Sequence, residues 1–321
     1  MEPTPVISII IPVRNRAGIV VRTLESIAAQ TYKNIRLIIV DNASTDDTAK
    51  VLSEWAETHR NEFERITVTS CPAVGAAQAR NHGLGLVDTD YVMYFDSDDV
   101  MLPDHLQRVN DYLVANPDTE ILRWNIGILD GDGWLHAKNH THTDELRLHI
   151  QHTSLSTQRF AVRAEILRKV GGWDEDLTIW LDYELGVRLI ASGHSVRVLS
   201  GEPRVIVFPT AESITGTSYS SRYDGHRHAF QKIRQHLSDM EDNRLPLLVL
   251  AAKEASISAV YRREGARDIS RPALREALMG FKLRQRLGLK IVYMTTRLFG
   301  KGGSSVANIL FSKRVPKKER D

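Results

Sequence analysis

Cysteine is almost absent from this sequence, since Cys71 is the only one in 321 residues. A single cysteine cannot form a disulfide within the chain, so the sequence fits a reducing compartment. No run of 18 apolar residues occurs, and we therefore expect no helix that spans a membrane. Residues 1–5 do not combine a basic segment with an apolar stretch, so we expect no signal peptide either.

Internal repeats, low-complexity linkers and a strong net charge are also absent. The net charge is +2, and the hydrophobic (42%) and charged (26%) fractions are ordinary for a soluble globular protein, so we expect no nucleic-acid partner. The charge is unevenly distributed, because residues 262–321 contain 16 Lys/Arg and 5 Asp/Glu, a net charge of +11, which leaves −9 for the first 261 residues. The length allows one large domain with an extension, or two domains.

The first 116 residues alternate between apolar runs and amphipathic segments. The apolar runs are typical of strands buried in a sheet, and they cover residues 6–13, 35–40, 65–70 and 91–95. The segments between them predict helices over residues 20–29, 44–57 and 76–86, the second of them capped by Ser44. Strands that alternate with helices predict an α/β fold with a mainly parallel central sheet and helices on both faces.

The pattern changes beyond residue 116. Shorter elements are predicted there: strands at residues 121–125, 195–198 and 205–208, helices at 161–170 and 182–191, and a hairpin over 127–140 that contains Asp130-Gly131-Asp132-Gly133. From residue 223 to residue 298 the periodicity is helical. The last residues, 300–321, begin rich in Gly and Ser and then become basic, so we expect a disordered tail.

Three carboxylates follow the fourth predicted strand, at Asp96, Asp98 and Asp99. The carboxyl ends of strands are where open α/β sheets bind ligands. Crowded carboxylates repel one another unless a cation neutralises them, and oxygen ligands suit Mg²⁺ or Mn²⁺. The alternative is a solvated acidic turn ahead of a helix that starts near Pro103-Asp104.

Six short motifs follow one another along the chain: Ile9-Ile10-Ile11-Pro12-Val13-Arg14-Asn15, Val40-Asp41-Asn42-Ala43-Ser44-Thr45-Asp46, Gly75 with Ala79-Arg80-Asn81-His82-Gly83, Asp96-Ser97-Asp98-Asp99, Gly171-Gly172-Trp173-Asp174-Glu175, and Asp182-Tyr183-Glu184-Leu185. Each motif alone is weak. In this order, the six closely resemble glycosyltransferase family 2 over residues 6–208. The resemblance implies the GT-A nucleotide-sugar-binding fold and the transfer of a sugar from a nucleotide diphosphate donor to an acceptor, usually with inversion.

The resemblance also implies which residues contact the nucleotide-sugar, namely Pro12, Val13, Arg14, Asn15, Asp41, Arg80, Asp96 and Ser97. Asp41 lies at a strand end, where its carboxylate can accept a hydrogen bond from a base N–H such as uracil N3–H. The fixed fork of the Arg80 guanidinium suits phosphate or base oxygens. The alternatives are a helix-capping turn residue for Asp41 and a solvated surface charge for Arg80. Arg14 departs from the aromatic or small residue that relatives often have there.

The same resemblance implies that Asp98, with Asp96, binds Mn²⁺ or Mg²⁺ and that Asp99 supports them. Such a metal clamps the diphosphate and neutralises charge on the leaving group.

Asp182 is the candidate general base, because an acceptor hydroxyl must lose its proton as it attacks. Relatives usually carry a Glu-Asp pair at this point, whereas this chain has Leu181-Asp182. The alternative for Asp182 is the N-cap of the following helix. Weaker acceptor contacts are expected from Trp173, Trp180 and Glu184, with core packing as the alternative for the two tryptophans.

Two departures from the family pattern concern histidine and processivity. Relatives often have a histidine shortly before the Ser-x-Thr motif, but Phe208-Pro209-Thr210, ahead of Ser213-Ile214-Thr215, contains none; His226 and His228 lie further on and could replace it. The Gln-x-x-Arg-Trp signature of processive members is absent, which favours the transfer of a single sugar.

The sequence therefore predicts a metal-dependent inverting glycosyltransferase that transfers one sugar, from a donor implied to be UDP-linked, to a glycan or lipid-linked acceptor, as in bacterial cell-surface polysaccharide synthesis. We expect a GT-A domain over residues 1–220, with a nucleotide-binding half (1–116) and an acceptor half (117–220). A helical extension (221–299) and the basic tail (300–321) follow.

Three other functions are alternatives to a glycosyltransferase. A nucleotidyltransferase would carry a Gly-rich phosphate loop after the first strand. A non-catalytic binder of sugar nucleotides or glycans would not need Asp182. A phosphatase would have its Asp-x-Asp motif after the first strand rather than the fourth.

The basic C-terminal region suggests a second kind of partner. Its net charge of +11, with the apolar residues Leu283, Leu287, Ile291 and Val292 nearby, predicts peripheral contact with an anionic membrane. We thus expect a cytoplasmic protein that can lie on the inner face of the membrane. The alternative is a helical layer packed on the catalytic domain with a solvated basic face.

Overall fold

The computed structural model describes residues 5–129, 135–138, 144–208 and 218–311. The chain forms two compact units, one of Met1–His149 with Thr153–Ser213 and one of Ile150–His152 with Ile214–Asp321. The domain boundaries predicted from the sequence, at residues 116, 220 and 299, stay predictions. Three predicted features lie outside the described residues: the turn at Asp130-Gly131-Asp132-Gly133, the Ser213-Ile214-Thr215 motif and tail residues 312–321.

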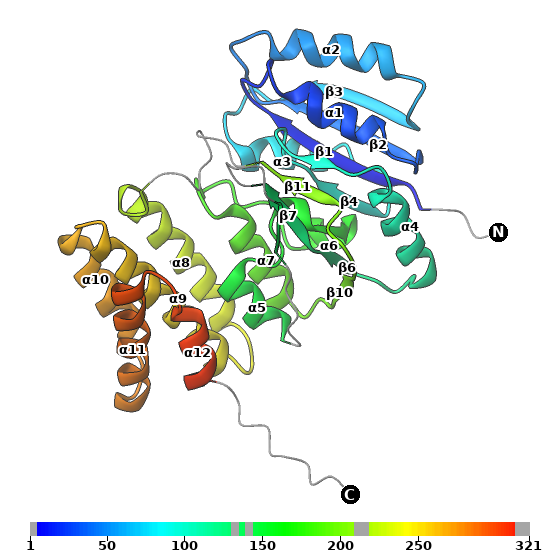
Figure 1. The fold of residues 1–321 in the computed structure, drawn as a ribbon. Coiled ribbons are helices and arrows are strands. Elements are labelled where there is room, and N and C mark those ends of the chain that lie inside the picture. Colours follow the sequence, from blue (N-terminus) through cyan, green and yellow to red (C-terminus); the bar gives the residue numbers. More distant parts are fainter. Residues whose placement is uncertain (1–4, 130–134, 139–143, 209–217, 312–321) are drawn as a thin grey trace, which may run out of the picture. The chain divides into compact units, whose positions relative to one another are not determined.

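The first unit is built on a seven-stranded sheet (Figure 1). Across the sheet the strands are β10 (Val196–Leu199), β6 (Ile121–Trp124), β9 (Phe160–Arg163), β4 (Tyr91–Tyr94), β1 (Ile7–Val13), β2 (Ile35–Asp41) and β3 (Arg65–Ser70). Neighbouring strands are parallel except at β9, which is antiparallel to β4 and β6. The structure confirms the predicted α/β fold with a mainly parallel sheet.

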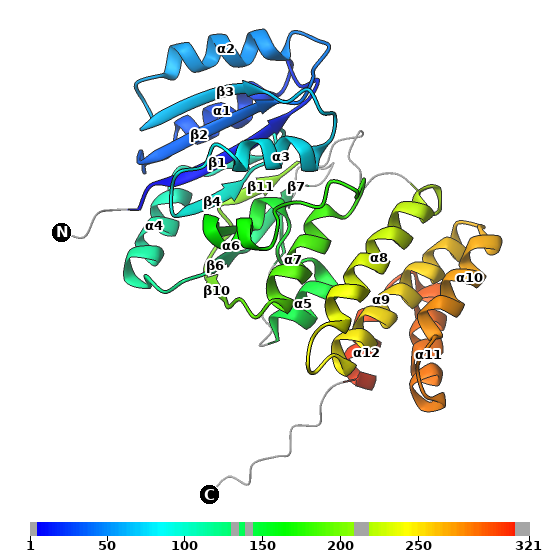
Figure 2. The same ribbon diagram turned by 180° about the vertical axis from the view of Figure 1, so that it is seen from behind.

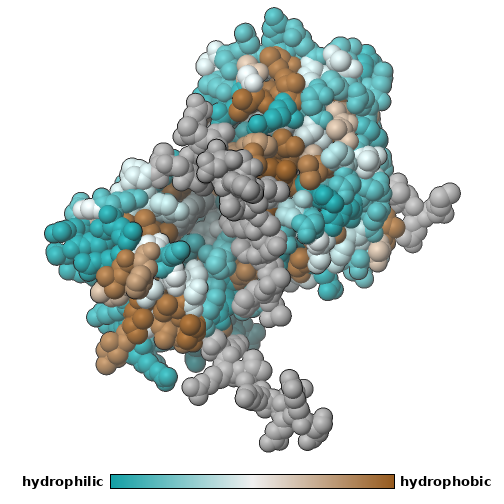
Figure 3. Space-filling view, in the orientation of Figure 1, coloured by the Kyte–Doolittle hydropathy of each residue, from teal (hydrophilic) through white to brown (hydrophobic). Residues whose placement is uncertain are grey.

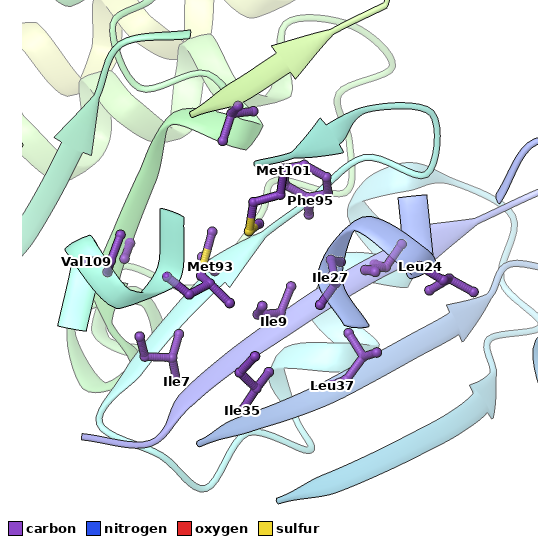
Figure 4. Close-up of a cluster of buried hydrophobic side chains, with 14 of the residues drawn as sticks. Ile7, Ile9, Leu24, Ile27, Ile35, Leu37, Met93, Phe95, Met101 and Val109 are labelled. Carbon is purple, nitrogen blue, oxygen red and sulfur yellow. The ribbon is translucent and has the colours of Figure 1, made fainter. Parts of the chain in front are cut away.

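Alternate residues of β1 enter two separate cores, because successive side chains of a strand point to opposite faces. Ile7 and Ile9 join the cluster around Leu24 of α1 (Val20–Ala28) and Val109 of α4 (His105–Ala115), which Figure 4 shows. Helix α2 (Thr48–His59) contributes to the same cluster. Ile10 joins the other cluster, formed with α3 (Ala76–Leu84), α6 (Ala164–Lys169) and α7 (Leu181–Ala191). Both faces are therefore covered by helices (Figure 2).

A second, four-stranded sheet in this unit has the order β5 (Val100–Met101), β11 (Val205–Val207), β7 (Ile126–Leu129) and β8 (Leu135–Lys138). Strands β7 and β8 are antiparallel, as the hairpin prediction requires. Strand β5 was not predicted, because its two residues are too few to show a pattern and it pairs with β11, far along the chain. The first five residues of helix α5 (Glu145–His152) and the 3-10 helix η1 (Thr157–Arg159) complete the unit.

Two local predictions are wrong. Residues 161–170 were expected to form one helix, but the first part is strand β9, since pairing with β4 and β6 outweighs the local pattern. Ser44 was expected to cap α2, which instead begins at Thr48 with Asp47 as N-cap. The Ser44 hydroxyl accepts a hydrogen bond from the backbone N–H of Asn15 over 3.0 Å, so it joins two loops.

The second unit is helical, as predicted. It contains η3 (Ser220–Arg222), α8 (Tyr223–Ser238), α9 (Arg244–Arg263), α10 (Arg267–Leu278), α11 (Leu283–Phe299) and α12 (Gly303–Phe311). Helix α9 packs against the four other α-helices. Part of the expected disordered tail is helix α12, whose Ala307 is buried in a cluster with Leu289 and Val292. Within the described residues, the helices are too short or too polar to cross a membrane.

The packing of α3 on the sheet makes a prediction at Gly83. A Cβ at this position would lie 2.6 Å from Ile10 Cγ2 and 3.3 Å from Val40 Cγ2. Overpacking of a core costs about 1–3 kcal/mol, whereas replacing a helical glycine by alanine gains about 0.5–1 kcal/mol. Gly83→Ala should therefore lower the free energy of unfolding by about 1–2 kcal/mol, as measured by urea denaturation.

Gly18→Ala is the control, because a Cβ there meets nothing within 4 Å. It should leave the urea midpoint nearly unchanged. An unchanged or higher midpoint for Gly83→Ala would contradict the close packing of α3 on β1.

Candidate functional site

The residues predicted to contact a nucleotide-sugar converge on one edge of the central sheet. Strand β1 lies between β2 and β4 and is parallel to both, so the carboxyl ends of the three strands meet at that edge. Asp41 ends β2, residues 12–15 end and follow β1, and the three carboxylates follow β4. The carboxyl edge of such a sheet is the usual place for a ligand.

Asp96 is held by two side chains. Arg80 Nη2 donates a hydrogen bond to Asp96 Oδ1 over 2.9 Å, and Gln158 Nε2 donates to Asp96 Oδ2 over 2.7 Å. The Arg80 guanidinium also lies over the ring of Trp173, 4.4 Å from its centroid. Arg80 is only 7% exposed, and its Nε has no hydrogen-bond partner among the described residues. Arg80 is therefore not a solvated surface charge, since it neutralises Asp96 inside the protein.

Asp99 is buried, with 1% of its surface exposed. Its Oδ1 accepts a hydrogen bond from Phe208 N over 3.1 Å, and Gln158 Nε2 also contacts its Oδ2. Burial, with a further contribution from the charge of Asp96, raises the pKa of Asp99 to about 8. Asp99 is thus largely protonated near neutral pH, which removes one negative charge from the cluster. Thr23 Oγ1 of α1 also donates a hydrogen bond to the backbone carbonyl of Asp99 over 2.8 Å. Asp99 therefore joins the segment after β4 to α1 and to Phe208 at the end of β11.

Asp98 is the carboxylate of the cluster that is left for a ligand. It is half-buried, its nearest described cation is Arg16 Nη2 at 4.0 Å, and its backbone carbonyl accepts a hydrogen bond from Arg22. Burial and the charge of Asp96 raise the pKa of Asp98, while Arg16 and Arg22 oppose the rise. A cation bound there would relieve the repulsion. Ser97, between the two, is buried at 8% exposure.

The donor set fits a hard divalent cation that also uses substrate oxygens. In the part of the chain that the structure describes, no three His, Cys, Asp or Glu side chains form a metal-holding group. Mg²⁺ commonly needs only one or two carboxylates together with substrate phosphates. Asp98, with Asp96 beside it, matches that requirement, whereas Asp99 is buried and its carboxylate is already engaged by Phe208 N and Gln158.

Asp41 offers a buried acceptor to the same edge. It is 7% exposed, and its Oδ1 has no hydrogen-bond partner within the described ranges. A buried acceptor without a donor is unfavourable, and the N–H of a ligand can satisfy it. The next residue, Asn42, fixes the facing loop, because its Nδ2 donates to Ala73 O over 2.6 Å and its Oδ1 accepts from Gly75 N over 2.8 Å.

The loop after β1 is held by hydrogen bonds to the segment that follows β2. Asn15, which has a left-handed φ of 50°, accepts a hydrogen bond at Oδ1 from Thr45 N over 2.8 Å. Arg14 Nη1 donates to Asn42 O over 2.9 Å. The Val13 side chain is buried and its carbonyl accepts from Asn42 N, so it faces the core. Pro12 is half-buried. Of these four residues, Val13 has the side chain least available for contact with a ligand.

Asp182 lies in the first turn of α7, two residues after Trp180. Trp180 is the N-cap, with a left-handed φ of 57°, so the alternative that Asp182 caps the helix is wrong. Burial is the main reason that the pKa of Asp182 is raised; Asp96 adds to the rise and Arg80 opposes it. These interactions place Asp182 within electrostatic reach of the carboxylate cluster. A raised pKa makes it a better proton acceptor than an ordinary aspartate.

Two of the weaker acceptor contacts do not fit the geometry. Glu184 has no exposed surface, and both of its carboxylate oxygens accept hydrogen bonds from Arg188, over 2.7 and 2.9 Å. Trp173 is 1% exposed and packs edge-to-face on Tyr94 under Arg80. Both side chains therefore support the fold, as the core-packing alternative for Trp173 proposed. Trp180 is half-buried beside Tyr183, at the end of α7 that carries Asp182.

His226 and His228, the possible replacements for the missing histidine, lie on α8 in the second unit. His226 is 3% exposed, and its Nδ1 is 3.0 Å from the Tyr261 hydroxyl. Burial lowers its pKa to about 4. His226 is thus a core histidine, which is the commoner role of such a residue.

Sequence reasoning missed the amides that hold the site together. Gln158 bridges Asp96 and Asp99, and it belongs to none of the six motifs. Asn81 was part of a recognised motif but had no role. Its Oδ1 accepts from Trp173 N over 2.8 Å and its Nδ2 donates to Glu175 Oε1 over 2.8 Å, so it fixes the turn before α7.

Two solved structures are similar to this one over nearly the whole chain. TarS 1–349 of S. aureus in complex with UDP-GlcNAc matches with a TM-score of 0.66 and 16% identity, covering 95% of this chain and 87% of that one. The mannosyltransferase PcManGT from Pyrobaculum calidifontis, in complex with GDP-Man and Mn²⁺, matches with a TM-score of 0.55 and 18% identity, covering 96% and 87%. These likenesses confirm the predicted GT-A fold.

Sequence comparison adds the family. The succinoglycan biosynthesis protein ExoW of Rhizobium meliloti is 40% identical over 103 residues, which are 31% of this chain and 31% of that protein. For three curated relatives that it matches, the chain spans only 15% to 44% of the relative's own length. The model for glycosyl transferase family 2 matches residues 8–171, just over half of the sequence, and the matched region includes the β1, β2 and β4 ends that form the site. The chain therefore belongs to glycosyl transferase family 2.

Proposed function

We propose that this protein transfers a single sugar, with inversion, from a nucleotide-diphosphate donor to a glycan or lipid-linked acceptor in polysaccharide synthesis. The observation that carries the proposal is the convergence of the carboxyl ends of β1, β2 and β4, which brings Asp41, the Arg80–Asp96 pair and Asp98 to one edge of the sheet. The names of the matched proteins support it, since ExoW is a succinoglycan biosynthesis protein and TarS and PcManGT hold sugar nucleotides.

In this proposal the donor lies along the carboxyl edge of the sheet. The buried Oδ1 of Asp41 accepts a hydrogen bond from the base, which suits N3–H of uracil and therefore a UDP-linked sugar. Residues 12–15 and Ser97 line the nucleoside, and Asp96 lies toward the ribose or the metal. A divalent cation, Mn²⁺ or Mg²⁺, held by Asp98 and Asp96 would clamp the diphosphate and neutralise the charge of the leaving group.

Asp182 acts on the acceptor in this proposal. Its carboxylate takes the proton from the acceptor hydroxyl while that oxygen forms a bond to the anomeric carbon. The bond between the anomeric carbon and the diphosphate oxygen breaks, and the nucleoside diphosphate leaves with that electron pair. Arg80 stays paired with Asp96, and its positive charge opposes the rise in the pKa of Asp182.

The loop after β1 argues against the nucleotidyltransferase rival. A phosphate-binding loop needs free backbone N–H groups. Here the N–H groups of Asn15, Arg16 and Ala17 donate to the side chains of Ser44, Thr48 and Asp46. Donor turnover distinguishes the proposed enzyme from a protein that only binds sugar nucleotides. A cytoplasmic location, with peripheral contact at the inner face of the membrane, fits the proposed lipid-linked acceptor and the single cysteine.

The donor can be identified by thermal-shift measurements with UDP-, GDP- and dTDP-sugars, each with and without Mn²⁺. A ligand at 100 times its Kd stabilises the folded state by about 2.7 kcal/mol, which gives a clear shift of Tm. We expect the largest shift with a UDP-sugar plus Mn²⁺, and donor turnover only when the metal is present. A shift without any turnover, across acceptors and metals, would favour the non-catalytic binder.

Asp98→Asn tests the proposed metal ligand. Losing one charged oxygen should weaken donor binding and lower kcat together, because the metal serves both. Both effects should be visible in Mn²⁺ titrations of donor turnover. Asp118→Asn, which removes an exposed carboxylate elsewhere in the first unit, is the matched control and should behave like the wild type. Activity that survives both EDTA and Asp98→Asn would show that the metal assignment is wrong.

Asp182→Asn tests the proposed base. Asparagine is nearly isosteric and can still accept from the Tyr183 N–H, but it cannot take a proton. Turnover should fall by about 10²–10⁴-fold, whereas donor affinity should stay within about threefold. The wild-type rate should fall as the pH drops through the raised pKa of Asp182, since only the deprotonated carboxylate is a base, and the variant should lack this limb.

Asp174→Asn distinguishes the proposed base from its neighbour. Asp174 follows Trp173 and is the next candidate, since Glu184 is buried in an ion pair. If Asp174→Asn removes turnover and Asp182→Asn leaves it nearly normal, the roles assigned here are reversed.

A further inference from the structure

Helix α11 has two apolar faces, and only one of them is covered. Gly288, Leu289, Val292 and Thr296 are buried, and Leu289 and Val292 join the cluster formed with α9 and α12. A second set of large apolar side chains on the same helix is exposed, which we call the α11 stripe: Leu283 (75%), Leu287 (53%), Ile291 (50%), Met294 (43%) and Leu298 (63%). The sequence-based expectation placed Val292 with this set, but Val292 has no exposed surface.

The α11 stripe is continuous along one side of the helix. Its members are separated by four, four, three and four residues, and at about 100° per residue they occupy an arc of about 80°. At about 1.5 Å per residue the stripe is about 22 Å long. Phe299, Ile309 and Leu310 add exposed apolar surface at the end of α11 and on α12. Figure 3 shows this surface as brown patches over α11 and α12. Contiguous exposed apolar surface of this kind marks an interaction site.

The stripe is bordered by positive charge. Arg286, Lys290 and Arg297 are exposed and lie along one flank of it at the same helical spacing, and exposed Arg284 lies on the other flank. From Ala277 to Lys318 the sequence contains ten Lys/Arg and no Asp or Glu. An apolar face with basic borders is complementary to a surface that is apolar inside and anionic outside.

We infer that the α11 stripe docks on an anionic lipid surface. The five apolar side chains enter the boundary between head groups and acyl chains, and Arg286, Lys290 and Arg297 lie against the lipid phosphates. Helix α11 lies in the plane of the surface, because its 17 residues include four basic side chains and cannot span a bilayer. This inference goes beyond the proposed reaction, since it rests on α11 and α12 and on no residue of the site.

A second copy of this chain is a poorer occupant. Two copies meeting through their stripes would bring the basic flanks together, and no acidic residue is present in this range to neutralise them. An anionic lipid surface relieves the same repulsion.

The test is sedimentation of the full chain with vesicles of phosphatidylcholine alone or mixed with phosphatidylglycerol, at low and high salt. We expect binding to the anionic vesicles that weakens with salt, and at least tenfold weaker binding to the neutral ones. The double variant Leu287→Gln/Ile291→Gln should reduce binding at least tenfold. Its matched control, Leu86→Gln/Val114→Gln, changes two apolar side chains of similar exposure in the first unit and should bind within twofold of wild type.

A second pair separates charge from apolar contact. Arg286→Gln/Lys290→Gln should remove most of the preference for anionic vesicles, whereas Lys50→Gln/Arg60→Gln, which removes the same charge from exposed positions in α2 and at its C-cap, should keep it. Equal binding to both vesicles, no binding to either, or wild-type binding by the stripe variant would overturn the inference. Lipid-free self-association that the stripe variant abolishes would also overturn it, because the stripe would then be an interface between copies. Donor turnover of the stripe variant should be unchanged, so failure of this inference removes the proposed membrane contact but leaves the proposed reaction untouched.

Discussion

Asp96, Asp98 and Asp99 follow one buried strand within four residues, and their mutual repulsion is the constraint on which the rest of the site depends. The protein treats each carboxylate differently. Arg80 neutralises Asp96, burial keeps a proton on Asp99, and Asp98 is left half-buried with a raised pKa. The result is a cluster whose remaining charge a bound cation can satisfy without unfolding the strand end.

Side-chain amides hold the carboxylates and the loops around them in place by hydrogen bonds. Gln158 reaches two of the carboxylates, Asn42 fixes the loop that faces Asp41, and Asn81 fixes the turn before α7. An amide both donates and accepts without adding charge, so it can join elements near the cluster without raising its electrostatic cost. His149 of α5 has a similar role, because it joins α5 to Tyr183 of α7. Its Nδ1 accepts a hydrogen bond from Leu155 N over 3.0 Å, so in the neutral ring Nε2 carries the proton and donates a hydrogen bond to Tyr183 O.

The second unit is organised around one central helix, α9. Helix α9 is buried on most sides by its four neighbours, so those helices can leave other faces uncovered without losing their core. Helix α11 does so with apolar and basic side chains. Ordinary surface helices present polar side chains to water, so the α11 stripe is a cost to the isolated protein that an interaction can remove.

The sheet and most of its helices could be predicted from the residues alone, because buried parallel strands are continuous apolar runs and their flanking segments have helical spacing. The same patterns placed Asp41, Asp98 and Asp182 at the ends of elements, and six motifs identified the family. Contacts in the folded chain were needed to show which face of α11 is covered, that β9 is a strand between β4 and β6, and that Glu184 and Trp173 are internal. The partners of Arg80 and the role of Gln158 also followed only from these contacts. These features depend on contacts between residues far apart in the chain, and a local pattern contains no information about which distant side chain will supply the charge or the hydrogen bond.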